Sequence, residues 1–287
     1  MNEKEKNKED HGSQMEQLKI RKSIVAGQFY PSQKAQLTQQ IASFVQKKSV
    51  PEEAIACILP HAGYIYSGKV AVQTISQVKI KNKIILLGPN HTGYGKNFSI
   101  MTEGIWQTPM GEVKIDTNLA EAILKHSHYL KDDFLAHLYE HSLEVELPIL
   151  QYFKTEFEIV PLVFLSEEVD ILKEIGKEIA SVIKDLGIKD SILLVASSDM
   201  THYEPQAEAE RKDKIAIEAI LNLDEDKLNK EAEALNITMC GIAPVTVVLS
   251  ASKALGAKSA RLVAYQTSGD LTGDYDSVVG YAGIIIS

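Results

Sequence analysis

Three histidines and an aspartate directly follow buried apolar segments of this sequence. His61 comes after "AIACILP", His91 after "KIILLGPN", and both Asp199 and His202 come after "SILLVASS". Imidazoles and carboxylates are the side chains that bind transition metals and exchange protons near neutral pH. One such histidine is most often an ordinary loop residue, but three at similar positions predict a shared site.

Asp199 and His202 lie three residues apart in "SSDMTHYEP". A carboxylate that accepts a hydrogen bond from an imidazole fixes its tautomer, for proton transfer or for support of a metal ligand. We therefore predict that Asp199 and His202 form a catalytic pair in one pocket, with the carboxylate bonding and orienting His202 or bonding a neighbouring backbone amide. The alternative is that Asp199 only caps a turn through its own backbone.

Cys240 lies in "TMCGIAP", just before a predicted helix. Thiols at helix N-termini have lowered pKa values, and the thiolate is both a nucleophile and a metal ligand. The alternative is a buried structural thiol, which is the interpretation that suits Cys57 inside a strand. A disulfide between the two is not expected.

His141 and Glu144 in "YEHSLEVELP" would share one face of a predicted helix at i, i+3. They are secondary candidates, which would either line a pocket or form a solvated pair. The remaining histidines lie in polar contexts and are interpreted as surface residues: His11, His126, His128 and His137.

Short apolar segments alternate with amphipathic ones along the chain. The pattern predicts strands over 54–59, 83–88, 157–165, 191–198, 259–268 and 277–286, and short antiparallel strands within 98–116. Helices are expected over 33–48, 67–78, 118–125, 142–153, 169–186, 206–221, 224–234 and 241–254. Because the strands are apolar without clean alternation, the sheet should be covered on both faces. We predict a three-layer α/β/α sandwich around a largely parallel or mixed sheet, with the site outside the carboxyl ends of its strands.

Composition and charge exclude several classes of protein. The net charge of −9 argues against nucleic-acid binding, and no apolar segment approaches the roughly 20 residues of a membrane span. Residues 1–20 are charged and polar, so we expect a disordered tail that precedes a single domain over 21–287. These features favour a cytoplasmic protein.

Eight motifs in this order resemble the Memo family, whose prokaryotic members are called AmmeMemoRadiSam system protein B. They are "GQFYP", "PHAGYIYSG", "GPNHTG", "TPMGEV", "EHSLEVELP", "SSDMTHY", "TMCG" and "DSVVGYAG". The resemblance implies a fold similar to that of class III extradiol ring-cleavage dioxygenases, which use non-haem iron. It implies that His61, His91 and Cys240 hold a metal, iron or copper, beside Asp199 and His202. It also implies partner proteins of the radical SAM and AMMECR types.

Three functions remain open from the residues. The first is a metal-dependent redox enzyme with a His61, His91 and Cys240 site. The second is a metal-free hydrolase with Cys240 as nucleophile. The third is a module that binds a phosphorylated or acidic peptide in a former enzyme pocket. In the dioxygenases a carboxylate stands where Cys240 stands here, so we do not expect ring cleavage.

Overall fold

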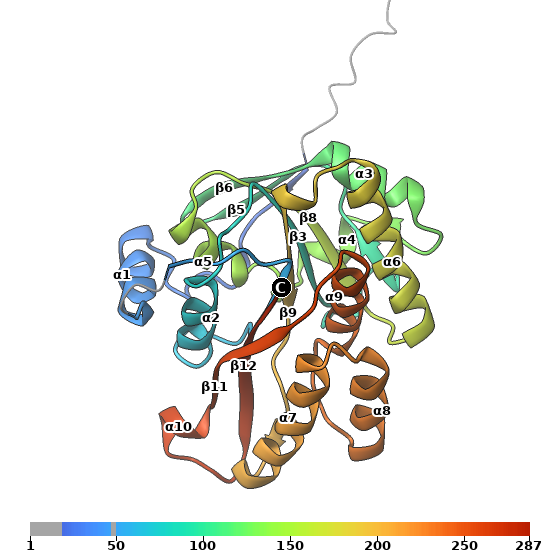
Figure 1. Ribbon diagram of the computed structural model, residues 1–287. Coiled ribbons are helices and arrows are strands. Elements are labelled where there is room, and N and C mark those ends of the chain that lie inside the picture. Colours follow the sequence, from blue (N-terminus) through green and yellow to red (C-terminus); the bar gives the residue numbers. More distant parts are fainter. Residues whose placement is uncertain (1–18, 47–49) are drawn as a thin grey trace, which may run out of the picture.

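The structure is a computed structural model that describes residues 19–46 and 50–287. Within this part of the chain the strands form a 12-stranded sheet with the spatial order β1-β5-β6-β8-β3-β9-β2-β12-β10 (Figure 1). The remaining strands join this path at β12, where β11 pairs, and at β8, where β4 pairs and carries β7. The strands are β1 (Ile20–Arg21), β2 (Ala56–Leu59), β3 (Lys83–Pro89), β4 (Phe98–Ile100), β5 (Ile105–Thr108), β6 (Gly111–Ile115), β7 (Lys131–Asp132), β8 (Glu158–Phe164), β9 (Ile192–Ser197), β10 (His202–Glu204), β11 (Ala260–Thr267) and β12 (Val278–Ile286).

The centre of the sheet is parallel. Strands β6, β8, β3, β9 and β2 all run in one direction, and β12 then pairs antiparallel with β2. Strands β2 and β9 are buried at every residue, and β3 and β8 at every residue but the first. Unbroken apolar sequence is what a parallel strand needs when helices cover both of its faces.

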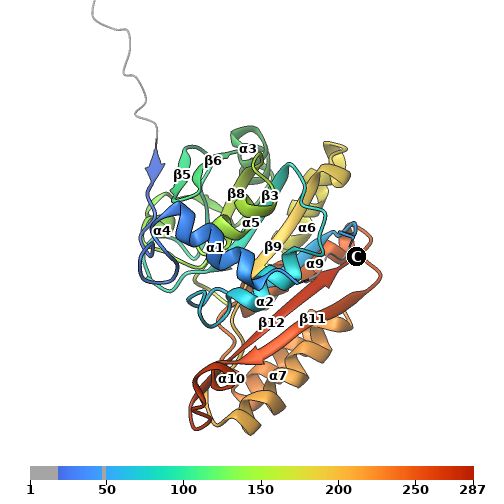
Figure 2. The same cartoon turned by 90° about the vertical axis from the view of Figure 1, so that its left-hand side faces the viewer.

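Helices cover the two faces of the sheet (Figures 1 and 2). One layer contains α1 (Lys34–Phe44), α2 (Gly68–Ile75) and α5 (Glu146–Phe153), which contact one another. The other contains α3 (Thr117–His126), α6 (Val169–Asp185), α8 (Glu225–Leu235) and α9 (Ile242–Ala254), and α7 (Gln206–Leu221) extends it over β11 and β12. The three-layer α/β/α prediction is therefore confirmed.

The closest helix pair depends on a glycine. A Cβ on Gly176 of α6 would lie 2.5 Å from the carbonyl oxygen of Val247 in α9. Only glycine allows the two helix backbones to approach this closely, and α9 in turn packs on β3 and β9. This contact fixes the position of the N-terminal end of α9, where Cys240 lies.

Some boundaries differ from the sequence prediction. The helix expected from residue 142 begins at Glu146, because residues 142–145 form turns. Strand β10 and the short helices α4 (Leu135–Leu138) and α10 (Gly269–Thr272) were not predicted. Residues 1–18 of the expected tail, with His11, lie outside the described residues, whereas Ile20 belongs to β1 and pairs with Ile105.

No helix within residues 19–46 and 50–287 combines the length and the apolar character that a membrane crossing requires.

Candidate metal centre

Three neighbouring parallel strands deliver the predicted residues to one edge of the sheet. The order β3-β9-β2 places β9 between the other two. His91, Asp199 and His61 each follow the last residue of their strand by two positions. The carboxyl ends of adjacent parallel strands meet at one edge, so the three side chains lie together.

Cys240 reaches the same edge from the opposite direction. It precedes Gly241, the N-cap of α9, and α9 packs across β3 and β9. The donor atoms of His61, His91 and Cys240 all lie within 4.8 Å of one another. Cys240 Sγ is 3.4 Å from His61 Nε2, and the His61 and His91 rings are 5.3 Å apart between centroids. The structure thus brings the three residues together, and their role as metal ligands stays a prediction.

Glu140 orients His91. It accepts a hydrogen bond from His91 Nδ1 at 2.9 Å and further bonds from the backbone amides of His91 and Ser142. Burial raises the pKa of Glu140, but the hydrogen bonds from His91 and from the Ser142 backbone amide, with the electrostatic interaction of the His91 and His141 rings, outweigh burial and lower it to about 2. Glu140 is therefore an anion, His91 Nδ1 carries the proton, and His91 Nε2 is left with a free lone pair. Glu140 was not among the residues predicted for the site, although it directly precedes His141.

His141 and Glu144, the two secondary candidates, have different positions. His141 stacks on His91 with ring centroids 4.7 Å apart and lines the pocket. Glu144 is fully buried away from it, paired with Arg21 and accepting hydrogen bonds from the Tyr30 hydroxyl and two backbone amides. The prediction that Glu144 could line a pocket or be a solvated pair is wrong, because it anchors the segment after β1.

Asp199 and His202 both line the pocket, but the structure shows them held by separate partners. Asp199 accepts a hydrogen bond of 2.8 Å from the backbone amide of His61. His202 Nδ1 lies 2.8 Å from the carbonyl oxygen of Thr238, to which it must donate because a carbonyl only accepts. The backbone of Thr238, rather than Asp199, therefore sets the tautomer of His202.

Two pKa shifts distinguish these groups. Burial raises the pKa of Asp199 to about 6, and the nearby His202 moderates the rise. Burial, followed by the charge of Asp199, raises the pKa of the Cys240 thiol well above its usual range. The lowered thiol pKa that the helix N-terminus predicted is therefore wrong, because desolvation outweighs the helix dipole.

The pocket over these residues has a volume of about 620 Å³. Its apolar and aromatic wall comprises Phe29, Ile65, Tyr66, Tyr203, Val279 and Tyr281. Ile65 and Tyr203 are 64% and 78% exposed, so they form the rim. Tyr203 has φ +60°, a conformation that is uncommon for a bulky residue and is frequent near functional sites.

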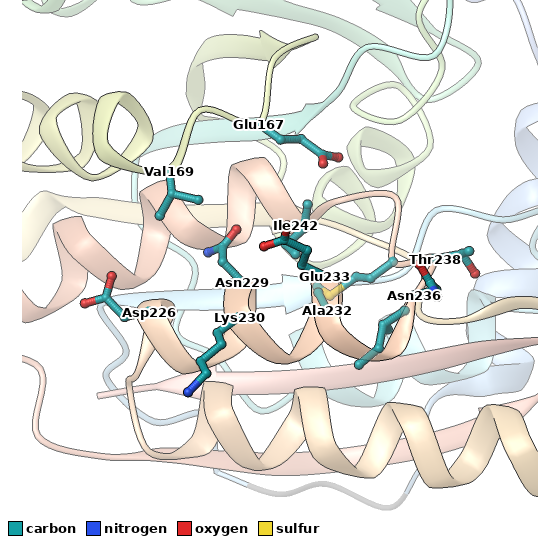
Figure 3. A pocket seen from close by; sticks show the side chains of 12 residues that line it. Glu167, Val169, Asp226, Asn229, Lys230, Ala232, Glu233, Asn236, Thr238 and Ile242 are labelled. Carbon is teal, nitrogen blue, oxygen red and sulfur yellow. The ribbon is translucent and has the colours of Figure 1, made fainter.

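A larger cavity of about 770 Å³ lies between α8 and the start of α9 (Figure 3). Its polar side chains include Glu167, Asp226, Lys230 and Glu233, and it contains neither histidine nor cysteine. Thr238 lines both cavities. The histidine and cysteine side chains of the candidate site therefore lie in the smaller of the two pockets.

The rest of the histidines and cysteines are placed as follows. His126 and His128 are exposed, as expected. His137 is fully buried, which corrects its interpretation as a surface residue, because α4 lies against Trp106. Cys57 is a buried free thiol within β2, and Cys240 is also free.

A family profile described as "Memo-like protein" matches residues 21–285. The chain belongs to the Memo family. It is 44% identical to a MEMO1 family protein of Aquifex aeolicus and 42% identical to one of Methanocaldococcus jannaschii. Each alignment covers 93% of this chain and 99% of the relative. The predicted membership is confirmed.

A crystal structure of an uncharacterized protein from Escherichia coli K12 has a similar fold. Its TM-score is 0.56 with 14% sequence identity, over 80% of this chain and 98% of that one. At this identity the similarity concerns the fold alone.

Proposed function

We propose that this Memo-family protein is a metal-dependent oxidoreductase that holds iron or copper through His61 Nε2, His91 Nε2 and Cys240 Sγ. The observation that carries the proposal is the convergence of one donor atom from each of these three residues within 4.8 Å. The Sγ–Nε2 distance of 3.4 Å to His61 is close to the separation of about 3.5 Å expected between sulfur and nitrogen ligands of one tetrahedral ion. Two imidazoles and a thiolate suit copper or thiophilic iron.

The surroundings of the donors fit a metal better than a metal-free nucleophile. A Cys–His ion pair needs a charged imidazole, yet burial lowers the pKa of His61 well below its usual range. The Cys240 thiol is likewise held in its protonated form by burial and by Asp199. A bound cation would reverse this preference, because a coordinating thiol loses its proton. The hydrolase hypothesis therefore has the weaker support.

The pocket also favours the enzyme over a module for phosphorylated or acidic peptides. Its lining in the described part of the chain includes no lysine or arginine, the residues that usually recognise phosphate and carboxylate groups. The carboxylate of Asp199 adds negative charge to the site. An apolar wall with a few polar groups instead suits a small organic substrate.

Side chains of the protein itself would transfer protons to and from a substrate bound in the pocket. When bound, iron or copper would supply one-electron chemistry. His202, whose Nδ1 proton is held by Thr238, has a free Nε2 that can take or deliver a proton in the pocket. Asp199, with a pKa near 6, contributes a carboxylate that exchanges its proton close to neutral pH. A cytoplasmic location, expected from composition, and partners of the radical SAM and AMMECR types, implied by the resemblance, belong to the same proposal.

Metal analysis of protein purified without a histidine tag tests the proposal. We expect one iron or copper ion per chain after anaerobic loading, and loss of that ion in His61→Ala and Cys240→Ser. His126→Ala, which removes an exposed histidine, is the matched control and should retain it. Electron paramagnetic resonance should show the bound ion reduced by ascorbate and reoxidised by air. Retention of metal in both site variants would contradict the site, and an ion that never changes oxidation state would contradict the redox function.

A further inference from the structure

Glu146 is a buried carboxyl group that lies beneath the site, and it pairs with no charged side chain in the described part of the chain. It is the first residue of α5 and is fully buried. Its Oε1 atom is 2.8 Å from the hydroxyl oxygen of Ser197, and its Oε2 atom has no hydrogen-bond partner among the described residues. An isolated carboxylate in such a place would be very costly, whereas a neutral acid is tolerated.

Ser197 connects Glu146 to His61. Ser197 is the last residue of β9, and its Oγ atom has three polar neighbours. The carbonyl oxygen of Ser142 lies at 2.8 Å, Glu146 Oε1 at 2.8 Å and His61 Nδ1 at 2.9 Å. A hydroxyl group has one proton to donate and two lone pairs that accept.

The single hydroxyl proton of Ser197 determines which group donates in each of the three hydrogen bonds. The Ser142 carbonyl can only accept, so it takes the single hydroxyl proton of Ser197. The other two neighbours must then donate to Ser197 Oγ. Glu146 can do so only as a carboxylic acid, and His61 only with its proton on Nδ1.

From this arrangement we propose that Glu146 is a neutral acid and a positioning residue, which acts through Ser197 to hold His61 with its Nε2 lone pair directed at Cys240. The 3.4 Å separation of Nε2 and Sγ is the geometry that this tautomer would present to an ion. Burial raises the pKa of Glu146, the hydrogen bond with Ser197 lowers it, and the charge of Asp199 raises it again; burial dominates and leaves the pKa well above its usual range.

The two histidines of the site would then donate their Nδ1 protons to acceptors of different charge. His91 donates to an anion, Glu140, whereas His61 donates to a hydroxyl that is backed by an uncharged acid. A third carboxylate, beneath a site that already contains Glu140 and Asp199, would add repulsion. The neutral acid supplies a hydrogen bond without that charge.

Three variants test the assignment. In Glu146→Gln the amide NH₂ can still donate to Ser197, so metal affinity should stay within about threefold of wild type. Glu146→Leu and Ser197→Ala remove the support and should weaken binding by about 10–100-fold, the usual cost of losing a partner behind a metal-ligating histidine. Ser252→Ala, which removes another buried hydroxyl at the far end of α9, is the control and should change nothing.

Two spectroscopic readouts do not depend on metal. Nitrogen-15 NMR of the metal-free protein should show the proton of His61 on Nδ1 in wild type and in Glu146→Gln, and a mixed tautomer in Ser197→Ala. Infrared difference spectra at neutral pH should show a protonated carboxyl band that Glu146→Gln loses. Absence of that band, or a His61 proton on Nε2 in wild type, would overturn the inference.

The inference rests on the proposed function only for the effect on metal affinity. If wild type binds neither iron nor copper, the proposed function fails, while the tautomer and the infrared band still decide the role of Glu146. If Glu146→Leu does not fold, Ser197→Ala and Glu146→Gln still give both readouts. Equal metal affinity in wild type and Ser197→Ala would also overturn the positioning role.

Discussion

Glu140 accepts two hydrogen bonds from one residue, His91, through the ring Nδ1 at 2.9 Å and through the backbone amide. This double contact fixes both the rotation of the imidazole and the path of the loop after β3. The pair joins residues 49 positions apart and is buried on the Glu140 side. Any ion held by His91 Nε2 would therefore depend on Glu140.

We expect Glu140→Gln to weaken iron or copper binding by about 10–100-fold, because the neutral amide holds the Nδ1 proton of His91 less strongly. Competition titration under anaerobic conditions measures the change. Glu178→Gln is a suitable control, because Glu178 bonds His128, an exposed histidine that does not line the pocket. Equal affinities in the Glu140 variant and wild type would show that His91 needs no such support or is not a ligand.

Glu144 lies four residues from Glu140 and has a structural role instead. Its pair with Arg21 is fully buried, so Glu144→Ala would leave a buried guanidinium with no counter-ion. We expect a loss of about 3–5 kcal/mol in the free energy of unfolding, measured in urea. The exposed pair of Arg211 and Glu208 gives the comparison, and Glu208→Ala should cost far less, because an exposed ion pair contributes little to stability.

The same variant separates stability from metal binding. Glu144→Ala should bind iron or copper with wild-type affinity under conditions where it is folded, since Glu144 does not line the pocket. A large loss of metal affinity in the folded variant would show that Glu144 does contribute to the metal site.

His137 should make stability depend on pH. It is fully buried, and burial lowers its pKa from 6.5 to about 4. Between these values the unfolded chain binds a proton that the folded chain does not, so stability falls as pH decreases from 6.5 to 4. The shift corresponds to about 3 kcal/mol. Urea titrations at pH 7 and pH 4 should show this loss in wild type and a smaller one in His137→Gln.

Much of the fold was predictable because its signals are local. The strands β3, β8 and β9 are unbroken apolar segments, and α7 occupies the residues expected for it, Gln206–Leu221. The predicted carboxyl ends of the strands also indicated where His61, His91 and Asp199 lie, since polar residues after a buried strand must lie at the edge of the sheet.

The partners of the site residues were not predictable in the same way. Ser197 and His61 are 136 positions apart, and Thr238 and His202 are 36 apart, so each contact depends on strand order and loop path. Glu144 was misjudged for a different reason. An i, i+3 pair shares a face only in a helix, but residues 142–145 form turns, and the carboxylate that faces the histidines is Glu140.

The last prediction concerns the choice of metal by Cys240. A thiolate favours copper or thiophilic iron, whereas a carboxylate favours harder ions such as ferrous iron or manganese. Cys240→Asp would create a set of two histidines and one carboxylate. Aspartate suits the position better than glutamate, because Cys240 Sγ already lies only 3.3 Å from the backbone nitrogen of Asp199. We expect the variant to prefer ferrous iron over cuprous copper, and wild type to show the reverse order, in anaerobic competition titrations. Cys57→Ala, which removes the other thiol from the core, should keep the wild-type order if it folds. The same preference in Cys240→Asp and wild type would mean that Cys240 does not bind the ion. The ion would then be held by imidazoles alone, and the thiol's contact with His61 would have to be explained by chemistry without a metal.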